Sequence, residues 1–245
     1  MSINRHPALD VRTRCSGSLR RTVVAISSLF LLVATVEAGP DDKAPPASTS
    51  GAKVLFDGKS LEVWKKCDFY KAGEVKVEDG LIIMSKGVSM SGITSTRQDL
   101  PTTNYELSYE AMRLAGRDFF AVATFPVGNS YITLVNGGWG GGVTGLSRLD
   151  GMDASENETT RSFRYQDKTW YRFRVRVTDK MIRCLIDDKE IVAVDHRDRR
   201  VATRIETRRK QPRGFATWES TVALRHIEIR PLTAAEIVET DEFDE

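Results

Sequence analysis

Apolar side chains and arginines alternate without a break from Tyr171 to Val177. Successive side chains of a β-strand point to opposite faces of a sheet, so this run predicts a strand with one buried face and one polar face. Residues 105–111 alternate in the same way. The chain therefore contains at least two strands that each cover a core on one side.

The region around these runs consists of short strand-like segments separated by turns. Residues 181–186 and 190–194 flank the polar residues 187–189 and predict a hairpin. Further short runs occupy residues 119–125, 131–135 and 224–229, and no segment keeps a helical spacing of apolar residues over four turns. The pattern predicts an all-β sandwich or barrel in a single domain over residues 54–232.

Residues 1–38 have the pattern of a cleaved signal peptide. Arginines precede an apolar run from Thr22 to Val36, and Val36 and Ala38 are residues that signal peptidase prefers before a cleavage point. The run of about 15 residues is shorter than the ~20 that span a bilayer as a helix. We expect cleavage after Ala38, no membrane span in the mature chain, and a secreted or periplasmic protein; a retained anchor is the alternative.

Two segments are expected to flank the domain. Residues 39–53 are rich in Pro, Ala and Ser and predict a disordered linker, and residues 233–245 carry six acids and predict a frayed acidic tail. Residues 1–38 hold five arginines and two acids, so the remainder has 31 basic and 32 acidic side chains. This balance gives no indication of nucleic-acid binding.

Cys67 and Cys184 are the cysteines outside the signal segment. In an oxidising compartment they form a disulfide if their geometry allows it. Two buried free thiols are the alternative, and the sequence leaves both open.

Two blocks near the start of the domain are distinctive. Residues 55–64 (LFDGKSLEVW) place an apolar anchor before an Asp-Gly turn and an aromatic, and residues 77–81 (VEDGL) break a strand at Asp-Gly. Residues 182–192 add a hairpin, and residues 214–218 (GFATW) with 222–229 add a closing pair of strands. In these motifs the sequence resembles the 3-keto-disaccharide hydrolase domain family over roughly residues 54–232.

The resemblance implies a concanavalin A-like jelly-roll β-sandwich of two antiparallel sheets. It also implies a carbohydrate substrate and hydrolysis of 3-keto-glycosides. A ketone at C3 acidifies the proton on C2, so a carboxylate base can remove it while the C1 substituent leaves; water then adds to the product.

Residues 137–142 (GGWGGG) place one aromatic, Trp139, in a glycine-rich stretch. The G-x-G-x-x-G match at residues 140–145 lacks the helix that a dinucleotide site needs. A Trp ring displayed on a loop is suited to stack on a sugar, and a ring folded back onto the sandwich is the alternative. The substrate-binding candidates are Trp139, Trp218 and Arg148.

Residues 150–158 (DGMDASENE) form the densest acidic cluster of the domain. Three interpretations stay open: Asp153 and Glu156 form a capping box, the cluster holds a hard cation such as Ca²⁺, or one carboxylate is a general base beside Trp139. We expect the ligand site where this cluster meets the glycine-rich loop. The catalytic candidates are Glu110, Asp150, Asp153 and Glu156.

Two other charged groups allow two interpretations each. Glu106 and Glu110 share one strand face, which is either a concave ligand surface or a face toward bulk water. Residues 196–213 carry eight Lys or Arg and two acids, which either bind an acidic polysaccharide or lie on a solvated hairpin.

Three functions follow from these observations. The chain is an exported hydrolase of 3-keto-glycosides, a non-catalytic carbohydrate-binding module on the same sandwich, or a structural domain of a cell-envelope assembly that binds protein. The sequence leaves open the sugar, the oligomeric state and whether the domain is catalytic.

Overall fold

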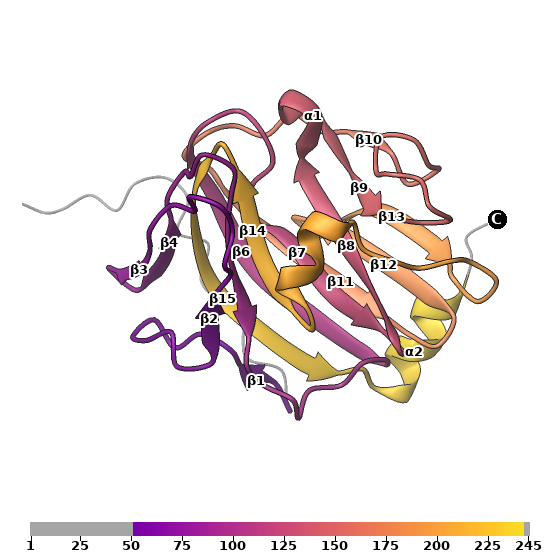
Figure 1. The fold of residues 1–245 in the computed structure, drawn as a ribbon. Coiled ribbons are helices and arrows are strands. Elements are labelled where there is room, and N and C mark those ends of the chain that lie inside the picture. The colour runs from indigo at the N-terminus through magenta and orange to yellow at the C-terminus, as the bar shows by residue number, and fades with distance from the viewer. Residues whose placement is uncertain (1–50, 243–245) are drawn as a thin grey trace, which may run out of the picture. The chain divides into compact units, whose positions relative to one another are not determined.

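The computed structural model describes residues 51–242. The expected signal peptide, and the expected linker except its last three residues, lie outside the described residues. Two antiparallel sheets pack into a β-sandwich (Figure 1), which confirms the predicted fold class. No helix within residues 51–242 is long and apolar enough to cross a membrane.

The larger sheet contains the strands that the alternating patterns predicted. The run around Tyr171 is a strand whose residues alternate between half-buried and buried along its whole length. In the predicted hairpin, Asp187 and Asp188 take up positive φ at the turn. In spatial order the sheet consists of β13 (Lys189–Asp195), β12 (Met181–Ile186), β11 (Trp170–Val177), β6 (Tyr105–Ala115), β15 (Thr221–Pro231), β4 (Leu81–Met84) and β3 (Val75–Glu78), with β1 (Lys53–Val54) paired to β15.

The smaller sheet carries a short helix on its outer side. In spatial order it consists of β10 (Arg161–Ser162), β9 (Val143–Ser147), β8 (Ser130–Gly137), β7 (Val122–Val127), β14 (Gly214–Trp218), β5 (Met90–Ser95) and β2 (Trp64–Lys66). The described helices are α1 (Gly138–Gly141), η1 (Ile205–Lys210) and α2 (Ala234–Asp241). Figure 1 shows η1, in orange, in front of the smaller sheet at β7 and β8.

Aromatic side chains join the two sheets across the interior. Tyr109 of β6 stacks on Phe173 of β11 with ring centroids 4.9 Å apart, and Phe215 of β14 meets the Tyr109 ring at 4.7 Å. All three side chains are buried. Cys67 and Cys184 are buried free thiols, so the structure corresponds to the free-thiol alternative.

The outer face of the larger sheet, which carries Glu106 and Glu110, is neither of the two surfaces expected from the sequence, a concave ligand surface or a face toward bulk water. Both glutamates are buried beneath arginines rather than exposed on a ligand surface or to bulk water. Glu106 accepts hydrogen bonds from Arg176 at 2.8 Å and Arg230 at 3.0 Å, and Glu110 accepts one from Arg225 at 2.7 Å. This face is therefore a layer of ion pairs.

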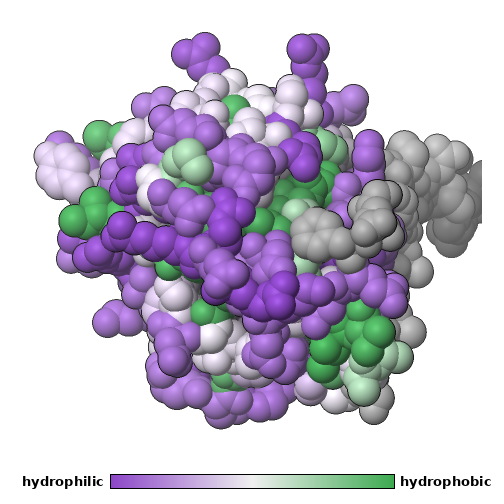
Figure 2. Space-filling view, turned by 90° about the vertical axis from the view of Figure 1, so that its right-hand side faces the viewer, coloured by the Kyte–Doolittle hydropathy of each residue, from purple (hydrophilic) through white to green (hydrophobic). Residues whose placement is uncertain are grey.

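The expectation of a frayed acidic tail is wrong for residues 233–241. Thr233 and Glu236 form a capping box that starts α2. Glu236 also accepts hydrogen bonds from Arg230, which lower its pKa to about 2, and Arg183 donates to the carbonyl of Thr240 at 2.7 Å. Arginines of the larger sheet thus hold both Glu236 and the end of α2. Seen from the side of β13 and α2, the surface is mostly hydrophilic with small hydrophobic patches (Figure 2).

Candidate functional site

A pocket of about 310 Å³ lies on the outer face of the smaller sheet. Strand alternation builds its floor, because Ile132 and Leu134 of β8 point into the core while Thr133 and Val135 line the pocket. The volume is at the lower end of the ~300–1,000 Å³ typical of small-molecule sites. The sandwich thus has a second apolar cluster, outside its core, whose buried members are Met90, Val122, Val135, Ala154 and Ala216.

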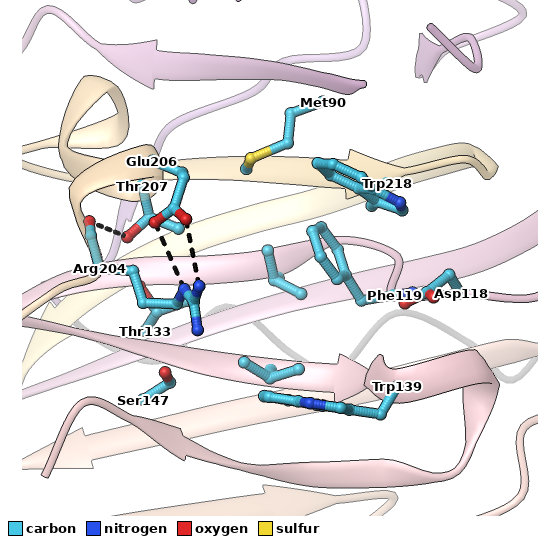
Figure 3. A pocket seen from close by; sticks show the side chains of 12 residues that line it. Met90, Asp118, Phe119, Thr133, Trp139, Ser147, Arg204, Glu206, Thr207 and Trp218 are labelled. Carbon is cyan, nitrogen blue, oxygen red and sulfur yellow. Dashed lines mark hydrogen bonds and ion pairs between the residues drawn. The ribbon is translucent and has the colours of Figure 1, made fainter. Parts of the chain in front are cut away.

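Three aromatic side chains line one end of this pocket (Figure 3). Phe119 and Trp218 have ring centroids 6.1 Å apart, and the Trp218 backbone N–H donates to the Phe119 carbonyl at 3.0 Å. Trp139 lies across from them in α1 and is 50% exposed. Asp118 holds this end together, since its carboxylate accepts backbone N–H groups of Phe119 at 2.7 Å and Gly140 at 3.2 Å.

The glycine-rich stretch is a tight turn in the structure. Trp139 itself has φ of 51° and Gly140 has φ of 81°. At Gly141 a Cβ atom would lie 2.7 Å from the carbonyl oxygen of Arg117, so only glycine fits there. The turn leaves the Trp139 ring half exposed at the pocket rather than folded into the core.

The other end of the pocket is polar. The Arg204 guanidinium donates to the carboxylate of Glu206 at 3.1 and 3.3 Å, and it also donates to Asp153. Ser147 donates to Asp153 at 3.1 Å. The hydrogen bonds from Arg204 lower the pKa of Glu206, so this carboxylate is ionised at neutral pH. An ionised carboxylate beside a guanidinium can accept a proton while a neighbouring positive charge stabilises a developing anion.

A buried lysine contacts Val122, one of the residues that line the pocket. Lys210, the last residue of η1, is fully buried, and its Nζ donates to the Val122 carbonyl at 3.5 Å. Burial lowers the pKa of Lys210 to about 7. Within residues 51–242 its side chain has no carboxylate partner, so no ion pair offsets the desolvation of the amine.

The structure brings three of the sequence candidates to this pocket. Trp139 and Trp218 line it, and Asp153 contacts two lining residues, Ser147 and Arg204. The sequence predicted a site where the glycine-rich loop meets the acidic cluster. The pocket lining includes Trp139 of that loop but no residue of 150–156. The polar end comes from the segment that begins η1.

The other candidates lie apart from the pocket lining. Asp150 accepts the backbone N–H of Arg200 at 2.7 Å and the side chain of Arg199 at 2.5 Å, and both interactions lower its pKa. Arg148 donates to the carbonyl of Gly151 at 2.9 Å. These contacts hold the turn between β9 and β10.

Glu156 and Glu110 also have structural partners. Glu156 accepts the backbone N–H of Asp153 at 3.2 Å, one of the two contacts of a capping box. Glu110 lies on β6 in the other sheet, paired with Arg225, so the structure does not bring it together with Trp139. For the cation interpretation, residues 51–242 contain no group of three His, Cys, Asp or Glu side chains arranged to hold a metal ion.

The sequence interpretation missed Arg204 and Glu206. Both lie in the basic region that was interpreted as solvated or as a polysaccharide-binding surface. The available signal was Glu206 itself, an acid two residues after Arg204 within a run of basic residues. Nothing in the sequence shows that η1 folds over the outer face of the smaller sheet.

The family of the chain identifies it as a carbohydrate-related, glycosyl hydrolase-like domain. The chain matches the 3-keto-alpha-glucoside-1,2-lyase-like domain family over residues 51–230 and therefore belongs to it. This match confirms the resemblance seen in the sequence motifs. No curated protein matches the chain.

Solved structures support the fold. The Crh5 transglycosylase in complex with NAG is similar at a TM-score of 0.51 and 11% identity, over 76% of this chain and 85% of that one. A sialidase is similar at a TM-score of 0.50 and 11% identity, over 76% of this chain and 19% of the sialidase. At these identities the likeness concerns the fold alone.

Proposed function

We propose that this domain binds a 3-keto-glycoside in the pocket on the smaller sheet and cleaves its glycosidic bond after removing the proton on C2. The observation that carries the proposal is the Arg204–Glu206 pair at the end of an aromatic-walled pocket, in a chain that belongs to the family. We also propose that the protein acts after export, directed by residues 1–38.

The proposed reaction begins with Glu206 as the general base. The C3 ketone withdraws electrons from the C2–H bond, so the carboxylate takes the C2 proton and the electron pair forms an enolate with its charge on the C3 oxygen. The enolate then forms the C1=C2 double bond as the C1–O bond breaks. The departing oxygen takes up the proton that Glu206 removed, which returns Glu206 to its carboxylate form, and water adds its hydroxyl to C1 and a proton to C2. The net result is hydrolysis.

Arg204 has two opposing effects in this scheme. It lowers the pKa of Glu206, which makes the carboxylate a weaker base but keeps it ionised. It also places a guanidinium where the enolate oxygen develops charge, and stabilisation of developing charge is commonly a large catalytic effect. Asp153 accepts a hydrogen bond from Nη1 of Arg204, whereas Nε and Nη2 donate to Glu206. Ser147 donates to Asp153, and these contacts keep Arg204 beside Glu206.

Incubation with 3-keto-trehalose tests this proposal. The wild-type protein should produce glucose and 3-keto-glucose. Trp139→Ala should weaken substrate affinity by about 1–3 kcal/mol, with little change in the free energy of unfolding because the ring is 50% exposed. Tyr70→Ala removes a 71% exposed ring outside the pocket and is the matched control. Binding without product would indicate a non-catalytic module, and Trp139→Ala unfolding with unchanged affinity would place the site elsewhere.

A further inference from the structure

The pocket has two chemically different ends. Figure 3 shows Trp139, Phe119 and Trp218 at one end, and Arg204 with Glu206 at the other. Met90 adds an apolar thioether to the aromatic end, since it pairs with Trp218 across β5 and β14. A ligand that fills the pocket must therefore be apolar in one part and polar in another.

Strand register fixes the distance between Trp218 at the aromatic end and the row of paired residues that ends at Ser147. Trp218 lies four residues from Gly214 along β14, and Gly214 pairs with Thr124 of β7. Thr124 pairs with Thr133 of β8, which in turn pairs with Ser147 of β9. Four residues along a strand span about 13 Å. This distance accommodates two linked rings, one at each end.

The aromatic end offers few partners for hydroxyl groups. Its one carboxylate, Asp118, accepts backbone N–H groups from Phe119 and Gly140, and the indole N–H groups of Trp139 and Trp218 are the other polar side-chain groups at this end. The floor beneath is formed by Val122 and Val135, which are both buried. A sugar ring there would replace only some of the hydrogen bonds that its hydroxyl groups make with water, whereas an aromatic ring needs none and gains contact with three rings.

We propose that the aromatic end is an aglycone subsite and that the domain prefers 3-keto-glycosides with an aromatic aglycone over those with a sugar or a small alkyl aglycone. The inference rests on the proposed function, since the keto sugar occupies the polar end beside Arg204 and Glu206. The aglycone is the group that leaves from C1 and takes up a proton.

Benzyl and methyl 3-keto-α-glucosides provide the test. Their leaving alcohols have similar acidity, so a difference in kcat/KM reports binding of the ring rather than the ease of bond breaking. Wild-type kcat/KM should be at least tenfold higher for the benzyl compound. The benzyl-to-methyl ratio should fall toward one in Phe119→Ala. It should be unchanged in Tyr70→Ala, which alters an exposed ring outside the pocket. A ratio is independent of the fraction of folded protein.

The outcomes separate the two proposals. If both compounds are cleaved with equal kcat/KM, the aglycone subsite is overturned and the proposed function stands. If neither is cleaved, the proposed function fails, and calorimetric affinities decide the subsite. At least tenfold tighter binding of the benzyl compound, lost in Phe119→Ala, then supports an aromatic subsite, and equal affinities overturn it.

Discussion

Replacing Lys210 with methionine should raise the free energy of unfolding by roughly 3–5 kcal/mol below pH 7. The lysine is fully buried, and burial lowers its pKa from 10.5 to about 7. Methionine has a similar unbranched shape and needs no partner for a charge. The expected increase in the free energy of unfolding equals the free energy that burying the charged amine costs the wild-type folded state.

The pH dependence of this effect is specific. Below pH 7 the amine is protonated in both states, so the full cost is present. Between pH 7 and 10.5 the unfolded chain still binds the proton while the folded protein does not, so the wild-type stability contributed by this group rises with pH. Above pH 10.5 the cost is absent. The advantage of Lys210→Met should therefore shrink steadily from pH 7 to pH 10.5.

Urea unfolding of both proteins at several pH values measures the effect. Lys189→Met, at an exposed position on β13, is the matched control and should change stability little at any pH. Two results would contradict a lowered pKa of Lys210 in the folded protein. One is a Lys210→Met protein that is less stable than wild type, and the other is a gain in stability that is the same at all pH values.

Glu206→Gln should lower kcat on 3-keto-trehalose by about 10²–10⁴-fold, the usual contribution of general base catalysis. Glutamine keeps the shape and can still bond to Arg204, but it cannot take the C2 proton. Glu206 is half exposed, so the substitution should leave the thermal unfolding temperature almost unchanged.

Glu78→Gln is the control for this substitution. Glu78 is exposed on β3 in the larger sheet, with Lys76 as its partner, and its loss should not affect turnover. Turnover by Glu206→Gln within a few fold of wild type would show that another group removes the proton.

The strands were predictable because their signals are local. The alternation that became β11 and the polar turn that became Asp187 and Asp188 are contained within a few residues. For Trp139 the sequence left two alternatives, a ring displayed on a loop or a ring folded back onto the sandwich, and the half-exposed ring corresponds to the first.

The polar end of the pocket was not predictable from these signals. Arg204 and Glu206 lie more than 60 residues after Trp139 and reach the pocket only because η1 lies over the smaller sheet. Composition was also misleading for α2. Its acids suggested a solvated tail, but Glu236 accepts hydrogen bonds from Arg230 of β15 and Glu239 accepts one from Arg176 of β11.

The most direct measurement follows the hydrogen on C2 when wild-type protein cleaves unlabelled 3-keto-trehalose in D₂O. Nuclear magnetic resonance of early product should show deuterium at C2 of the 3-keto-glucose, because the proposed reaction removes the original proton and water returns another. Free 3-keto-glucose held in D₂O for the same time measures uncatalysed exchange. Product that keeps its C2 proton at the level of this control would show that C1–O cleavage proceeds without proton abstraction, and it would contradict the proposed reaction.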